Sequence, residues 1–492
     1  MSDFSILLPD GANFKPNKKQ IRFIQTNSKI QSFLESGQDS SISLIVGQKG
    51  SGKSIIIGYK SYKDRTEDTE NKKFIPEEGV ERIDFNGLLS SNELSRHVKF
   101  QNWEQIHKVS IYYFILCKLE GQLAESDLLK KEYDFENIFK NYHDIFNPNR
   151  FDFNQMSLGG ILFKCITNRN FVYDTHDDFI SNATLLIKSY ISKREVRLYI
   201  DNIDQALHSA LFKESSNKSK DFEEILNVEK EEKPDFVDGK IVDLEEFIAN
   251  NSFDASDKSV KSWFGSHVGF LLAIYSINLL SRKLNIYATF RLEAYEYFEF
   301  LELRNNPQYR SIKVKINYTE HDFKEIYDKL IHAAEIDKTE IERLSLDILP
   351  HNYVENVLYN KESLWSFVKR HTFLNPREIT FQIMILKEIL EDYKGREISK
   401  EIIHHIFTNR ISKDGFKLII RDLYAETLPF FPRMELIDFY YKNKKNYIKK
   451  ANITSENRSL ILILYRLGLV GTLSTKGNII KQKFLNKNVF ST

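Results

Sequence analysis

Eight consecutive residues near the N-terminus have the types and spacing that bind phosphate. They follow the apolar segment 44–46 and form the pattern G-x-x-x-x-G-K-S: Gly47, Gln48, Lys49, Gly50, Ser51, Gly52, Lys53 and Ser54. An apolar strand, a glycine-rich loop and Lys-Ser at the start of a helix together indicate a phosphate-binding loop, whereas a plain glycine turn would explain only the glycines.

Each residue type in this loop has a physical role. We expect Gly47 and Gly52 to adopt backbone angles that a side chain would forbid. The loop N–H groups and the helix N-terminus present partial positive charge to an anion. Lys53 can reach the outer phosphates of a nucleotide, and the Ser54 hydroxyl can bind Mg²⁺.

A carboxylate follows a second apolar strand, residues 196–200. Asp201 at the tip of this strand can hold Mg²⁺ directly or through water. The next residue is Asn202, where most hydrolytic proteins with this loop have a glutamate, and an amide cannot take a proton. Asp204 is then the remaining carboxylate that could polarise a water molecule, although it could equally cap the helix that follows.

A third strand, residues 284–290, should end beside the Asp201 strand. Thr289 could touch the γ-phosphate or its water, but ordinary strand propensity explains it more simply. Arg291 follows at the strand tip, where ligands bind in open parallel sheets, and we expect it to act on the nucleotide. Glu293 and Glu296 offer it an alternative salt-bridge role.

Arg377 lies in the segment Asn375-Pro376-Arg377, which starts a helix. Proline is favourable in a first helical turn, but a cation there is not favoured by the helix dipole. An anionic partner therefore explains its position, either a nucleotide phosphate or a carboxylate such as Glu378.

Composition excludes several classes of protein. The 492 residues carry a net charge of +1, so there is no overall electrostatic bias toward nucleic acid. Two cysteines, Cys117 and Cys165, make neither a disulfide framework nor a metal-site pattern, and we expect buried thiols in a reducing compartment. The absence of a membrane span or leader predicts a cytoplasmic protein without a membrane partner.

The remaining periodicity predicts an α/β fold. Strands are expected at 41–46, 80–85, 196–200, 284–290 and 312–316, separated by helices at 54–61, 102–119, 185–190 and 260–280, with a short helix at 25–34 and a loop at 62–76. Such alternation indicates a parallel sheet covered on both faces, an αβα sandwich. Helices dominate after residue 320, at 320–334, 338–346, 362–369, 376–393 and 401–408.

This pattern divides the chain into four parts. Residues 1–40 are a helical lead-in, and 41–325 are the core with an acidic insertion at 213–250. Residues 326–410 form a helical lid, and 411–492 form a basic domain.

The C-terminal part carries local positive charge. Residues 433–492 contain twelve Lys and Arg against three Asp and Glu, so their net charge is +9. A helix at 457–467, a turn at 468–471 and a hairpin to Phe484 outline a winged helix that could contact DNA or RNA phosphates. Alternatively, this basic face is solvated, or packs on the acidic insertion or on a partner protein.

In their order, these motifs resemble bacterial P-loop ATPases of the AAA/STAND branch, related to origin-recognition and KAP-type ATPases. The residues that carry the resemblance are 47–54, 199–204, 290–291 and 375–377. Many such proteins are encoded in mobile or anti-phage defence loci. The resemblance implies an αβα ATPase core, a helical lid and a C-terminal winged helix. It assigns Lys53 and Ser54 to the phosphate loop, Asp201 to magnesium and Arg377 to the lid as a sensor arginine.

Two functions of different classes follow. The first is a cytoplasmic ATPase switch that binds ATP and Mg²⁺ and associates with a protein partner or a second copy of itself. The second is a nucleic-acid-binding regulatory protein that nucleotide only stabilises, with negligible turnover. The same loop serves small-molecule kinases, but the long extension after the core and the Asn-Pro-Arg segment argue against that class.

Overall fold

The computed structural model describes part of the chain, and the following account is confined to it. The described residues are 24, 27–37, 42–48, 50–67, 71–84, 98–99, 102–124, 157–168, 171–172, 176–202, 258–292, 294–295, 298, 313–336, 364–370, 372, 375–392, 472–476 and 479–483. The chain divides into two compact units. The sheet unit is Ser28–Lys49 with Lys53–Ile316, and the helical unit is Met1–Asn27, Gly50–Gly52 and Asn317–Thr492.

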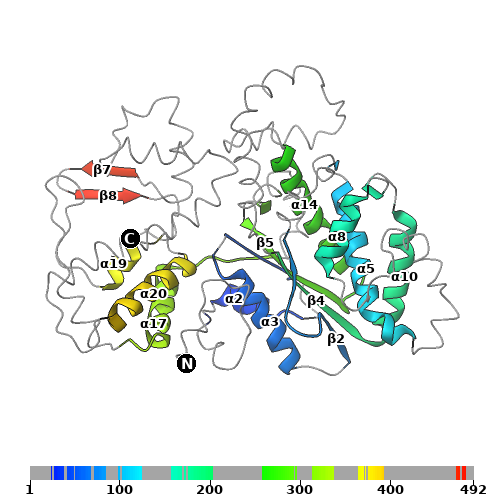
Figure 1. The fold of residues 1–492 in the computed structure, drawn as a ribbon, viewed down its shortest axis with the longest axis horizontal. Helices are drawn as coiled ribbons and strands as arrows, with labels where there is room; N and C mark the ends of the chain where they lie inside the picture. The colour runs from blue at the N-terminus through cyan, green and yellow to red at the C-terminus, as the bar shows by residue number, and fades with distance from the viewer. Residues whose placement is uncertain are drawn as a thin grey trace, which may run out of the picture. The chain divides into compact units, whose positions relative to one another are not determined.

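The sheet unit contains a parallel sheet, as the alternation of strands and helices predicts (Figure 1). The strand order is β2-β4-β5-β1-β6, and β3 pairs with the same edge of β4 as β2 does. The strands are β1 (Leu44–Gly47), β2 (Lys72–Ile75), β3 (Glu81–Ile83), β4 (Glu195–Asn202), β5 (Leu284–Arg291) and β6 (Lys313–Lys315). Strand β5 therefore separates the loop strand β1 from the Asp201 strand β4.

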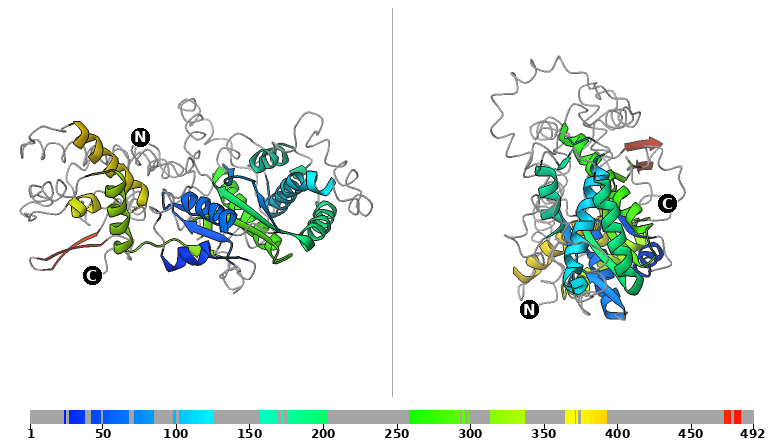
Figure 2. Two further views of the ribbon diagram at one scale, coloured as in Figure 1. Left: turned by 90° about the horizontal axis from the view of Figure 1, so that it is seen from below. Right: turned by 90° about the vertical axis from the view of Figure 1, so that its right-hand side faces the viewer.

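Helices cover both faces of this sheet (Figure 2). One face carries α2 (Ser28–Leu34) and α3 (Lys53–Glu67). The other carries a helical layer of α5 (Asn102–Ala124), α8 (Leu158–Thr167), α10 (Asp177–Lys193) and α14 (Lys258–Asn278). Strand β4 is buried along its whole length, because both faces are covered. No described helix is long and apolar enough to cross a membrane.

The prediction of a loop at 62–76 is wrong. Helix α3 continues to Glu67, and β2 occupies Lys72–Ile75. The polar sequence of this helix end is misleading because its inward face is charged. Asp64 is buried beside Arg197 of β4, with 3.0 Å between Nη1 and Oδ2, and Tyr199 donates to the same carboxylate at 2.7 Å.

Lys60 connects α3 to the end of α2. Its ammonium is fully buried and donates to the carbonyls of Ser36 at 2.7 Å and Leu34 at 3.3 Å. It also forms an ion pair with Asp64 at 3.2 Å and lies 4.4 Å from the centre of the Tyr287 ring. Burial lowers the pKa of Lys60 to about 8, although Asp64 partly offsets this effect.

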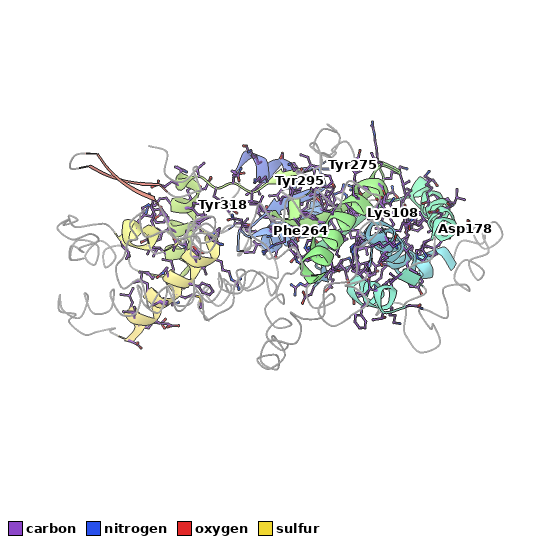
Figure 3. The ribbon with its side chains drawn as sticks, turned by 90° about the horizontal axis from the view of Figure 1, so that it is seen from above. Lys108, Asp178, Phe264, Tyr275, Tyr295 and Tyr318 are labelled. Carbon is purple, nitrogen blue, oxygen red and sulfur yellow. The ribbon has the colours of Figure 1, made fainter. Side chains whose placement is uncertain are left out.

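In the opposite layer, α5 and α14 cross at close range. Figure 3 shows the side chains that crowd this crossing, where α14 carries Phe264 and Tyr275. A Cβ atom on Gly269 of α14 would lie 2.6 Å from Cβ of Trp103 and 2.8 Å from the backbone nitrogen of Glu104. Only glycine permits this approach. Both cysteines are buried, as expected from the sequence, and burial raises the pKa of Cys165 to about 12.

The helical unit has its own apolar core. It is formed by α17 (Glu320–Ala333), α19 (Leu364–Arg370) and α20 (Pro376–Asp392), as the periodicity predicts. Thr319 and Asp322 form a reciprocal capping box at the start of α17. Strands β7 (Thr472–Lys476) and β8 (Ile479–Lys483) pair antiparallel, which confirms the C-terminal hairpin. The helices expected at 338–346, 401–408 and 457–467 lie outside the described residues.

The Gly269 contact predicts a sharp loss of stability on Gly269→Ala. We expect the free energy of unfolding to fall by about 2 kcal/mol, because the added methyl must push α5 and α14 apart. Gly159→Ala in α8 is the matched control, since its Cβ meets nothing closer than 3.7 Å. Urea unfolding measures both variants, and equal midpoints would contradict the close crossing.

The buried Lys60 predicts a pH dependence of stability. The folded chain releases this proton near pH 8, and the unfolded chain only near pH 10.5. Between these values the unfolded state binds more protons, so the free energy of unfolding should rise with pH. Relative to Lys60→Met, we expect a gain of at most about 3 kcal/mol from pH 8 to 10.5. Urea unfolding across this range measures it, and parallel pH profiles would refute it.

Candidate functional site

The phosphate-loop sequence adopts the strand-loop-helix arrangement that its pattern predicts. Strand β1 ends at Gly47, and α3 begins at Lys53. Gly50 and Gly52 have φ values of +74° and +89°, which favour glycine. Gly47 does not have a positive φ, which corrects the expectation for this residue. It is still part of the sheet, in register with Arg291 of β5.

The middle of the loop makes contacts that group it with the helical unit. The Tyr318 hydroxyl donates to the carbonyl of Ser51 at 3.2 Å. A Cβ on Gly50 would lie 2.5 Å from the side-chain amide of Asn375. Burial raises the pKa of Tyr318, which therefore keeps its proton and donates this hydrogen bond at neutral pH. Lys49 lies outside the described residues.

The Lys53 ammonium is held inside its own loop. It is only 7% exposed, and Nζ donates to the carbonyls of Gly47 and Gln48, each at 2.8 Å. A carbonyl oxygen only accepts hydrogen bonds, so both bonds keep the Lys53 ammonium beside the loop backbone. This is the position from which an ammonium group can bind a phosphate that enters the loop.

Asp201 connects three elements of the sheet unit. The Thr289 hydroxyl of β5 donates to its carboxylate at 2.8 Å, and the Ser54 side chain at the start of α3 lies close enough to lower its pKa. Burial raises the pKa of Asp201, and these two side chains together with the charges of Lys53 and Arg82 counteract that rise. The residues expected to bind phosphate and Mg²⁺ therefore lie together.

Thr289 has a larger role than strand propensity suggests. Its hydroxyl donates to Asp201 and accepts from the backbone N–H of Asn202 at 2.8 Å. One buried side chain thus satisfies the carboxylate and the last backbone donor of β4. The sequence contains no signal for this role, because it depends on the pairing of β4 with β5.

Asn202 lies on the opposite face of the sheet from Asp201. Its Nδ2 is 3.0 Å from Nε2 of His267 in α14, whose Nδ1 is 2.8 Å from the carbonyl of Trp263. A carbonyl only accepts, so Nδ1 carries the proton, and in the neutral ring Nε2 accepts from the Asn202 amide. His267 was missed by sequence reasoning, although a histidine within the apolar sequence of α14 is an unusual feature.

The other expected site residues lie in different parts of the chain. Arg291 ends β5 and is only 8% exposed, beside the first loop residue in the ladder. Asp204, Glu293 and Glu296 lie outside the described residues. Arg377 belongs to the helical unit, where it is the second residue of α20 and its guanidinium lies 5.8 Å from the Phe381 ring centre.

The start of α20 has the local structure that its sequence indicates. Pro376 is the first helical residue, and the Arg377 backbone N–H donates to Oδ1 of Asn375 at 3.0 Å. Glu378 is buried in the same first turn. The segment therefore brings Asn375 and Arg377 to a helix N-terminus within the helical unit.

Comparisons with known proteins identify no family for this chain. No protein-family model matches it, and no curated protein matches it. Among solved structures, the ORC2 protein of Aeropyrum pernix, in its ADPNP-ADP complexes, aligns with a TM-score of 0.29 and 10% sequence identity. The alignment covers 93% of this chain and 86% of that one. A TM-score this low supports no conclusion about fold or function.

The double role of Thr289 predicts that its hydroxyl stabilises the sheet. Thr289→Val keeps the shape but leaves Asp201 short of a donor and the Asn202 N–H short of an acceptor. We expect the free energy of unfolding to fall by about 2 kcal/mol. Thr289→Ser keeps the hydroxyl and serves as the control in urea unfolding. If the valine variant is at least as stable as the serine variant, the hydroxyl has no such role.

Proposed function

We propose that this chain is a P-loop ATPase that binds ATP with Mg²⁺ at residues 47–54. The observation that carries the proposal is the closeness of the Ser54 side chain and the Lys53 charge, at the start of α3, to the buried Asp201 carboxylate, whose pKa both lower. A loop that binds phosphate becomes a nucleotide site when a carboxylate for the metal lies beside it. This group is at the carboxyl edge of a parallel sheet, where ligands bind in such folds.

The residues of the site suit a magnesium nucleotide. Mg²⁺ prefers oxygen ligands and is commonly held by one or two carboxylates together with substrate phosphates. The Ser54 hydroxyl and the Asp201 carboxylate are such ligands, and Mg²⁺ would neutralise charge on the phosphates. The N-terminus of α3 and Lys53 would bind the phosphates themselves.

The finer assignments belong to the same proposal. Asp204 is proposed to polarise the attacking water, with Arg291 and Arg377 contacting the nucleotide. We further propose that ATP switches the chain between states that differ in their affinity for a protein partner or a second copy. The likeness to AAA/STAND ATPases supports this assembly role and a place in bacterial defence or DNA-linked assembly. It also supports a lid at 326–410 and a winged helix at 411–492.

One observation favours a second candidate function, a nucleotide-stabilised regulatory protein with negligible turnover. The residue after Asp201 is Asn202, whose amide is engaged by His267 on the other face of the sheet. Neither group is a carboxylate that could take a proton from water. In this candidate, residues 433–492 would bind DNA or RNA regardless of the nucleotide.

Lys53→Ala tests the ATPase directly. We expect magnesium-dependent ATP turnover to fall about 100-fold, because the phosphates lose a preorganised cation. Lys63→Ala is the matched control on the same helix, where Lys63 forms an ion pair with Glu67 at the helix end. Turnover of each variant is measured with and without Mg²⁺, and nucleotide binding by calorimetry.

The outcomes separate the two candidates. Turnover that is lost in Lys53→Ala and kept in Lys63→Ala supports the ATPase, and stimulation by double-stranded DNA would add nucleic acid to its partners. Unchanged turnover in Lys53→Ala would contradict the ATPase site. Tight binding without turnover in the wild type favours the regulatory candidate, which also predicts salt-sensitive DNA binding.

A further inference from the structure

Arg82 lies beside the candidate metal carboxylate, although sequence reasoning did not select it. It is the middle residue of β3 and is in register with Asp201 of β4 in a parallel ladder. Register partners on neighbouring strands share a face of the sheet. Arg82 and Asp201 therefore lie on the face that α3 covers, about 5 Å apart in backbone position.

The two neighbours of Arg82 in β3 contact the helical layer on the other face of the sheet. Glu81 accepts a hydrogen bond from the backbone N–H of Leu158 at 2.7 Å, at the start of α8. Ile83 is buried in the main apolar core. These two side chains attach β3 to the helical layer. Arg82 is the one residue of this three-residue strand that points to the phosphate-loop side.

Arg82 acts electrostatically on Asp201 without forming an ion pair with it. The side chain is exposed, and within the described part of the chain no carboxylate forms an ion pair with it. The Asp201 carboxylate accepts a hydrogen bond from Thr289 instead, and Arg82 acts on it through space by lowering its pKa. The guanidinium therefore remains available to bind another anion.

Strand order limits which anion Arg82 can reach. From the loop strand outward, the order is β1, β5, β4 and β3, so three strand spacings, about 14 Å, separate β3 from β1. Phosphates at the N-terminus of α3 would lie near β1, because β1 ends at Gly47, where the loop that leads to Lys53 begins. Only a group that extends past Asp201, away from the loop, comes within the length of an arginine side chain.

We propose that Arg82 binds the terminal phosphate of a nucleoside triphosphate and so distinguishes triphosphate from diphosphate. This inference rests on the proposed nucleotide site. Arginine suits the role because its planar guanidinium donates two parallel hydrogen bonds to a phosphate. A diphosphate ends before this position and leaves Arg82 in solvent, so ADP affinity does not depend on it.

Nucleotide affinity tests this assignment without relying on turnover. Dissociation constants for ADPNP and for ADP, both with Mg²⁺, are measured by calorimetry for the wild type, Arg82→Gln and Arg82→Lys. Arg194→Gln is the matched control, since it removes the same charge from an exposed residue just before β4, at the opposite edge of the sheet. Thermal melting checks that each variant is folded.

We expect Arg82→Gln to weaken ADPNP binding about tenfold or more while ADP binding stays within about twofold of the wild type. The ADPNP affinity of Arg82→Lys should lie between those of the wild type and Arg82→Gln, because lysine keeps the charge and loses the paired donors. Arg194→Gln should change neither constant.

Two results would overturn the assignment while leaving the nucleotide site intact. Either both nucleotides lose affinity equally in Arg82→Gln, or neither does. If the wild type itself binds neither nucleotide, the proposed function fails, and this inference fails with it. If Arg82→Gln does not fold, the ratio of ADPNP to ADP affinity in Arg82→Lys decides the question.

Discussion

Burial of the Asp201 carboxylate is the constraint on which the candidate site depends. A charged carboxylate without contact with water must be hydrogen-bonded or it becomes neutral. Here Thr289 of β5 donates the hydrogen bond, and Ser54 and Lys53 at the start of α3 lower the pKa of the carboxylate. The interactions that keep the carboxylate charged therefore favour a position of the start of α3 beside the edge of the sheet. The geometry of the phosphate loop follows from this requirement, since Lys53 and Ser54 are the first residues of α3.

Helix α3 is attached to β4 by polar contacts at both ends. Ser54 lies beside Asp201 near the carboxyl end of the strand, and Asp64 pairs with Arg197 near its beginning. Buried ion pairs stabilise little in net terms, but breaking one leaves an uncompensated charge, so they disfavour alternative positions of the helix. The proposed nucleotide site depends on the position of this helix N-terminus, which such a double attachment would fix.

The two faces of β4 serve different purposes. Asp201 faces α3 and the loop, whereas Asn202 faces α14 and His267. Side chains alternate along a strand, so neighbours in sequence enter different environments. A polar pair between Asn202 and His267 occupies the position where the sequence pattern would have a carboxylate. If the proposed function holds, the group that polarises water must therefore lie elsewhere in the chain.

Much of this organisation can be predicted from local sequence. The phosphate loop, the parallel sheet and the helices of the second unit follow from glycine spacing, apolar runs and periodicity, because these signals act over a few residues. The same holds for Asp201 at a strand tip and for Pro376 at the start of α20.

Other features depend on contacts between distant segments and were decided by the tertiary structure alone. The end of α3 was mistaken for a loop because its buried face is charged and its partners lie in β4. Thr289 and Arg82 carry no local signal, and the apolar surroundings of His267 mark it without naming its partner, since strand pairing and helix placement bring each of them to Asp201 or Asn202. The sequence by itself determined the strand-loop-helix arrangement of the glycine-rich loop, because that pattern is local. The order of the parallel strands decided which side chains stand beside Asp201, because it joins segments far apart in the sequence, 88 residues in the case of Thr289.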